Sequence, residues 1–111
     1  MSEGIEKSYE VSFQIIMSAG DAQDNAMKAI DAANKNAFDE AENLVKEAKD
    51  CLKEAHKSQT DLLAKEADGD HMEVNALMVH AYDHYAMALM AIDMAKMAIS
   101  LNKKIFDLSG E

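Results

Sequence analysis

Three side chains that could do chemistry lie close together in the sequence, at His80, Asp83 and His84. If this segment is helical, spacings of three and four residues place them at neighbouring positions on one helix face. A neutral imidazole is a good nucleophile near pH 7 and also binds transition metals, whereas a carboxylate suits hard cations such as Mg²⁺. The spacing therefore permits either phosphoryl transfer through a histidine or metal binding.

The segment around these residues has the pattern of a coiled-coil seam. One set of seam positions is Ala76, Asp83, Met90 and Met97, and the other is His80, Met87, Met94 and Leu101. Steps of four and three residues alternate, so all eight positions fall on one face of a helix. That face is apolar except for its histidine and its aspartate, which are costly in an apolar contact unless something pairs with them.

Composition and charge restrict the class of protein. The chain has 111 residues, no proline, 11 basic and 21 acidic residues, and a net charge of −10, which argues against nucleic-acid binding and favours a partner with a basic face. Residues 1–10 are acidic and polar rather than signal-like, and no apolar run approaches the roughly 18 residues of a membrane span. The single Cys51 excludes an internal disulfide, and we expect a cytoplasmic protein with Cys51 as a packed thiol.

Apolar periodicity predicts three helices, over residues 2–34, 37–67 and 73–106, within a single domain of residues 1–111. Asn36 and Gly69 lie in the predicted turns, which are short enough to make neighbouring helices antiparallel. We therefore predict an all-α, up-down-up three-helix bundle. Gly20 falls in the middle of the first helix, where the sequence predicts a close approach between helices.

The third predicted helix is apolar on nearly all sides, so one of its faces should meet another subunit. The heptad spacing favours a cyclic oligomer with copies of this helix around the axis; an exposed methionine-rich groove for a partner helix is the alternative. In such an oligomer Asp83 meets its own copies, and a ring of carboxylates requires shared protons or a cation similar to Mg²⁺.

His80 lies near the start of this helix, where free backbone N–H groups favour an anion. A histidine there can accept a phosphoryl group, although on spacing alone a hydrogen-bonded interface histidine is favoured. In the second predicted helix, Gln59 occupies a seam position with His56 one turn before it, a pattern typical of a polar contact between helices.

Four segments together resemble the enzyme IIA component of the lactose/cellobiose (chitobiose) branch of the bacterial sugar phosphotransferase system. They are Ile15–Ala22, Asn36–Ala41, Glu54–Thr60 and, most specifically, the Val-His-Ala-Tyr-Asp-His-Tyr segment at residues 79–85. The resemblance covers essentially the whole chain. It implies a homotrimer of three-helix subunits, a bundle of nine helices with the third helix of each chain inside.

The resemblance also implies roles for individual residues. The phosphocarrier protein HPr would phosphorylate His80, which would pass the group to a cysteine of the IIB component during sugar uptake. Asp83 would hold one Mg²⁺ per trimer at the three-fold axis, and His84 and Gln59 would lie near the phosphoryl group. Which sugar is transported and which ring nitrogen is phosphorylated do not follow from the residues.

Two positions depart from the family pattern. Tyr82 stands where the family usually has glutamine, and Gln23 stands where arginine is common, so support of the phosphoryl group would differ. Two alternative interpretations, from other classes of protein, remain open. One is a metal-binding helical bundle that uses His80, Asp83 and His84, and the other is a purely structural coiled-coil adapter.

Overall fold

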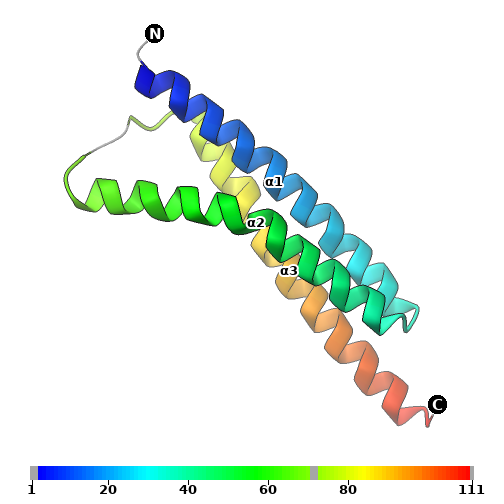
Figure 1. Cartoon of the computed structure of the whole chain (residues 1–111). Coiled ribbons are helices and arrows are strands. Elements are labelled where there is room, and N and C mark those ends of the chain that lie inside the picture. The colour runs from blue at the N-terminus through cyan, green and yellow to red at the C-terminus, as the bar shows by residue number, and fades with distance from the viewer. Residues whose placement is uncertain (1–2, 71–72, 111) are drawn as a thin grey trace.

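The computed structural model describes residues 3–70 and 73–110, with side chains from residue 6 onward. It contains three helices, α1 (Glu3–Asn34), α2 (Phe38–Ala67) and α3 (Ala76–Leu108), and no strand in these residues. The predicted all-α, up-down-up three-helix bundle is confirmed (Figure 1). In the described part of the chain, no helix is both long and apolar enough to cross a membrane.

Local chemistry explains where the helices end. Asn36 has a φ of 63° and Gly69 a φ of 93°, left-handed conformations that reverse the chain after α1 and α2. At the start of α3, the Asn75 side chain accepts a hydrogen bond of 2.9 Å from the backbone N–H of Met78. Because Asn75 acts as this cap, α3 begins at Ala76 and not at residue 73, where the sequence placed it.

The other predicted helix boundaries differ by smaller amounts. Residue 2, the predicted start of the first helix, lies outside the described residues, and α2 begins one residue later than predicted. The third helix continues to Leu108, beyond the predicted end at residue 106. Its last turns are held by packing, since the Phe106 ring contacts the Phe38 ring edge to face, with ring centroids 5.9 Å apart.

The helix α1 packs against both of the other helices, which contact each other much less. A core made largely of alanine lets the three backbones come close. Its α1 members are Ile15, Ala19, Ala22, Ala26, Ala29, Ala32 and Ala33, facing Ala41, Val45, Ala48, Leu52 and Ala55 of α2 and Ala81, Tyr85, Ala88, Ala91, Ile92, Ala95 and Ile99 of α3.

The helix α2 bends near its middle, and its second half diverges from the bundle (Figure 1). The predicted α2 seam is accordingly buried only as far as Ala55, while Gln59 and Leu62 are half-buried.

The prediction for Gly20 is wrong within the subunit: Gly20 is exposed, and a Cβ added there would meet nothing within 4 Å. The core on α1 lies on the alanine stripe next to Gly20, so no helix approaches it.

Candidate phosphoryl-acceptor site and its exposed seam

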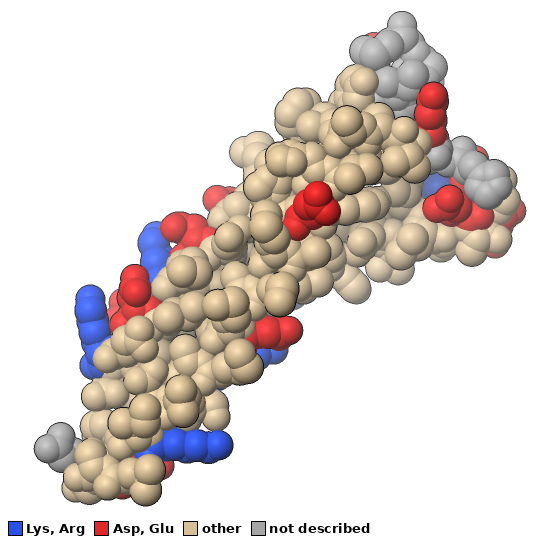
Figure 2. Space-filling model, turned by 180° about the vertical axis from the view of Figure 1, so that it is seen from behind, with Lys and Arg blue, Asp and Glu red and all other residues tan. Residues whose placement is uncertain are grey.

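The predicted seam of α3 is open to solvent along its whole length. Its methionines keep 46% to 68% of their surface exposed, and Leu101 keeps 60%. The opposite side of α3 carries Met78, Ala81, Tyr85, Ala88, Ile92, Ala95 and Ile99, all of which are buried. On the face shown in Figure 2, charged side chains lie mainly at the margins of a long uncharged surface. The subunit therefore covers one side of α3 and leaves the seam without a partner.

His80 and His84 lie side by side at the N-terminal end of this seam. Their Nε2 atoms are 3.1 Å apart, and the rings meet edge to face with centroids 4.5 Å apart and planes at 89°. His80 is exposed and His84 is half-buried. The hydrogen bond requires one nitrogen to carry a proton and the other to offer its lone pair. The predicted neighbours are thus in direct contact.

Asp83 is exposed on the same seam, one turn from His80. Among the described side chains, no three His, Cys, Asp or Glu residues are grouped closely enough to hold a metal ion. The three-ligand site of the metal-binding alternative is therefore not assembled within the subunit. An oxygen-lined Mg²⁺ site at Asp83 would require carboxylates from other copies of the chain.

Tyr82 does not share the face of His80, because residues two apart on a helix point about 160° away from each other. Its side chain is half-buried toward α2, where burial and the charge of Glu66 raise the pKa of Tyr82. The phenol therefore keeps its proton at neutral pH. Within its own subunit, Tyr82 is not placed beside the histidine that the resemblance marks as the acceptor.

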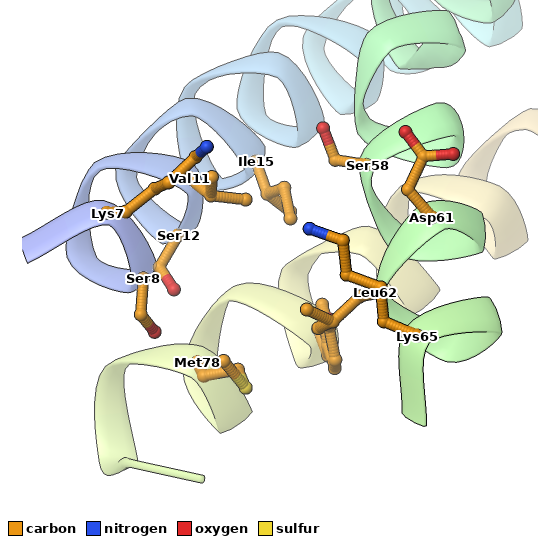
Figure 3. Close-up of a pocket in the computed structure, with 11 residues that line it drawn as sticks. Lys7, Ser8, Val11, Ser12, Ile15, Ser58, Asp61, Leu62, Lys65 and Met78 are labelled. Atoms are coloured by element: carbon orange, nitrogen blue, oxygen red, sulfur yellow. The ribbon is translucent and has the colours of Figure 1, made fainter. Parts of the chain in front are cut away.

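The side chain of Tyr82 instead lines a cavity of about 370 Å³ between the three helices, opened by the divergence of α2. Lys7 of α1 and Lys65 of α2 line this cavity, and in Figure 3 the ammonium group of Lys65 points into the space between the helices. The buried hydroxyls of Ser8 and Ser12 line its wall, and Ser8 Oγ accepts a hydrogen bond of 3.2 Å from Asn75. The sequence does not reveal this cavity, because its lining depends on the bend in α2.

Gln59 lies half-buried in the second half of α2, and the hydrogen bonds found among the described residues include none between it and the histidine pair. One turn before it, His56 Nδ1 lies 2.9 Å from the Tyr85 hydroxyl, a bond that ties α2 to α3 next to the bend. Burial raises the pKa of Tyr85, so this phenol also stays protonated. The predicted polar contact between helices is made by His56.

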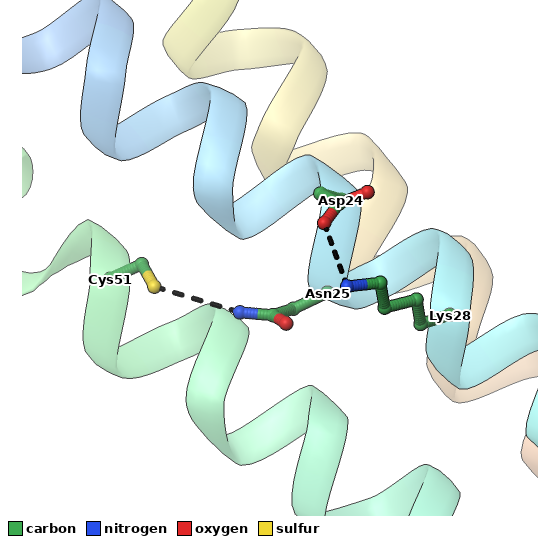
Figure 4. A network of polar contacts seen from close by, with 4 residues as sticks. All are labelled: Asp24, Asn25, Lys28 and Cys51. Atoms are coloured by element: carbon green, nitrogen blue, oxygen red, sulfur yellow. Dashed lines mark hydrogen bonds and ion pairs between the residues drawn. The ribbon is translucent and has the colours of Figure 1, made fainter.

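Gln23 of α1 is half-buried and immediately precedes Asp24 and Asn25 in the sequence. These two residues belong to a small polar network (Figure 4). Asp24 and Lys28 form an ion pair of 3.1 Å at the surface, and Asn25 donates a hydrogen bond of 3.8 Å to the Cys51 sulfur on α2. Cys51 is half-buried and is packed against the core. This environment is that of a packed thiol, as predicted from its place in the sequence.

The chain is similar to known proteins over most of its length. The family described as "PTS system, Lactose/Cellobiose specific IIA subunit" matches residues 10–103. The chain belongs to this family. The lactose-specific EIIA component of Staphylococcus epidermidis is 43% identical over 94 residues, which are 85% of this chain and 90% of that protein. The lactose-specific EIIA component of Streptococcus mutans is 40% identical over 99 residues, covering 89% of this chain and 95% of that protein.

Solved structures agree with this assignment. The crystal structure of the cellobiose-specific enzyme IIA of the phosphotransferase system from Bacillus anthracis superposes with a TM-score of 0.84 at 33% identity, over 96% of this chain and 94% of that one. The structure of PtcA from S. mutans gives a TM-score of 0.85 at 33% identity, over 93% and 99% of the two chains. The protein is thus a sugar-specific IIA subunit of the phosphotransferase system, as the four sequence segments indicated.

Proposed function

We propose that this IIA subunit is a phosphoryl carrier whose acceptor is His80. Phospho-HPr is the donor, and a cysteine of the IIB component is the next acceptor during sugar uptake and phosphorylation. The observation that supports this most is the exposed His80 ring, whose Nε2 lies 3.1 Å from that of His84 at the end of an uncovered apolar seam.

The reaction consists of two displacements at phosphorus. A lone pair of the neutral His80 ring attacks the phosphoryl group of the donor, an N–P bond forms, and the bond to the donor breaks. The IIB thiolate then attacks the same phosphorus, a P–S bond forms, and the electron pair of the N–P bond returns to His80. His84 stands close enough to hydrogen-bond a phosphoryl oxygen on His80, which is its proposed supporting role.

The carrier works as a homotrimer with α3 of each chain inside a nine-helix bundle. The radius of gyration of the subunit is 17.5 Å, whereas about 13 Å is usual for a compact chain of 111 residues. Its accessible surface of 7410 Å² also exceeds the roughly 6,100 Å² expected for a compact monomer of 12.2 kDa. Together with the open methionine seam, this excess surface supports assembly through α3.

In the trimer, the three copies of Asp83 would hold one Mg²⁺ on the axis. The ion would neutralise carboxylates that otherwise repel one another at the centre of the assembly. The acidic surface favours docking onto a donor with a basic face, such as HPr, and the relay would operate in the cytoplasm.

A phosphotransfer assay tests the proposal. Incubation with phosphoenolpyruvate, enzyme I and HPr should place one phosphoryl group on each chain, measured by intact mass and mapped to His80 by peptide mass spectrometry. His80→Ala should accept none, because it lacks the nucleophile. His56→Ala is the matched control, since it removes an imidazole that bonds Tyr85 on another face. Phosphorylation of the His80→Ala chain would show that the acceptor lies elsewhere.

A further inference from the structure

We propose that the His80–His84 pair binds one divalent transition-metal ion, of the Zn²⁺ and Ni²⁺ class, and that this binding and phosphorylation of His80 exclude each other. The binding stands on the geometry of the pair alone. The exclusion rests on the proposed function. The ion is distinct from the Mg²⁺ proposed at Asp83, both in its ligands and in its chemistry.

The separation of the two nitrogens fits two ligands of one ion. Bonds from Zn²⁺ to imidazole nitrogen are about 2.0–2.1 Å long. Two nitrogens 3.1 Å apart therefore subtend an angle of about 95–100° at an ion held by both, between a right angle and the tetrahedral value. The rings are already close, with centroids 4.5 Å apart, so rotation of the two side chains would turn both nitrogens toward one ion.

The surroundings of the pair also suit a cation. Both rings project from one rigid helix four residues apart, so chelation costs little conformational entropy. His80 is exposed in the subunit, so the ion's remaining coordination positions are open to water or to a group of a neighbouring copy of the chain. The net charge of −10 raises the local concentration of cations. Imidazole nitrogen is a good ligand for Zn²⁺, Ni²⁺ and Cu²⁺, whereas Mg²⁺ prefers oxygen.

Exclusion follows from the electronic structure of the ring. A neutral imidazole has one nitrogen with a free lone pair, and its other nitrogen carries the proton. When a metal occupies the lone pair of Nε2 in His80, the proton is on Nδ1, and neither nitrogen can attack phosphorus. A phosphoryl group on Nε2 of His80 takes up the same lone pair, so phosphorylation at that nitrogen must weaken metal binding by the same coupling.

Calorimetric titration of untagged, full-length chain with Zn²⁺ tests the binding. We expect one Zn²⁺ per chain, unaffected by millimolar Mg²⁺. His84→Ala should weaken the affinity by about tenfold or more, since even loss of an outer-shell partner costs that much. His56→Ala and Cys51→Ser should leave the affinity unchanged. If His84→Ala bound Zn²⁺ as tightly as the wild-type chain, the ion would not be held by the histidine pair. Loss of Zn²⁺ binding in Asp83→Asn, with His84 intact, would also contradict the proposed site.

Purified phospho-HPr as donor tests the exclusion without enzyme I. Zn²⁺ should block transfer to the wild-type chain, and a chelator should restore it. In His84→Ala, the Zn²⁺ concentration that halves transfer should rise by about tenfold or more, whatever the rate without metal. Full transfer to the Zn²⁺-saturated wild-type chain would refute the exclusion. Failure of transfer without any Zn²⁺ would refute the proposed function instead, and the calorimetric result would still decide the metal site.

Discussion

At the scale of single residues, the helical period separates the groups that act from those that support the fold. His80, Asp83 and His84 all project from the exposed side of α3. Tyr82, between them in sequence, is directed to the interior of the subunit and lines the cavity beside α2. The departure from the family pattern at Tyr82 therefore changes the packing of α2 against α3, and not the immediate neighbourhood of His80 within the subunit.

Tyr82→Phe should consequently have little effect on phosphoryl acceptance. Removing one hydroxyl from the cavity wall should change the rate by less than about threefold, the range expected for substitutions away from the reacting groups. The measurement is the initial rate of phosphorylation by phospho-HPr, with helicity followed by circular dichroism. A drop of a hundredfold with the fold intact would mean that Tyr82 reaches the phosphoryl group on a neighbouring subunit.

At the scale of helices, α1 contains a feature that the subunit itself does not explain. Gly20 lies in the interior of α1, is exposed, and has open space where a side chain would begin. Gly20→Ala should therefore stabilise the protein by about 0.5–1 kcal/mol, because alanine loses less backbone entropy in a helix. Thermal unfolding followed by circular dichroism measures this. A lower melting temperature would indicate that a neighbouring subunit approaches the backbone at Gly20.

The methionine seam of α3 should hold the subunits together. Met94 keeps 50% of its surface exposed in the subunit, so Met94→Glu should leave the three-helix fold intact. In the trimer it would bury three like charges, and we expect dissociation to monomers. Light scattering coupled to size-exclusion chromatography reports the mass. Leu63→Glu is the control, since Leu63 is 58% exposed on the diverging half of α2, and this variant should stay trimeric.

At the scale of the whole molecule, the subunit is an elongated body of 62 × 23 × 19 Å whose longest helix is covered on one side. Such a shape leaves a continuous apolar surface along the long axis, which assembly around that axis would bury. The charged and polar groups of the site then lie at one end of the seam. In this arrangement the proposed acceptor His80 would be at the subunit interface, and the carboxylate of Asp83 would be nearest its own copies.

Asp83→Leu tests what holds the centre of the assembly. Replacing three facing carboxylates by apolar side chains removes a buried repulsion, so the trimer should persist or become more stable to dilution. Sedimentation velocity over a range of concentrations checks this, with and without a chelator. Dissociation of Asp83→Leu, or of the wild-type protein on removal of Mg²⁺, would instead show that the carboxylates hold the subunits together through the metal.

Much of the fold was predictable because it depends on local patterns. Apolar residues at a period of 3.6, the absence of proline, and Asn36 and Gly69 at the turns determine three long helices and their antiparallel order. The boundary at Asn75 was placed wrongly, since the apolar pattern around it does not reveal which side chain turns back to cap the helix. Spacings of three and four residues likewise predict that His80, Asp83 and His84 share one helix face, without any knowledge of how the helices pack.

The chemical groups, the helix that carries them and the apolar seam around them can be predicted from the amino-acid sequence alone, because these follow from the geometry of a single helix. The three-dimensional packing is needed to show which side of α3 the subunit covers, where α2 leaves the bundle, and that Tyr82 lies in the resulting cavity. These features depend on packing between residues far apart in the chain. The periodicity of apolar residues within one helix does not show which distant residues pack together. Because α3 is apolar on nearly all sides, its sequence does not show which side faces the core. The packing of α1 and α2 against one side of α3 settles this.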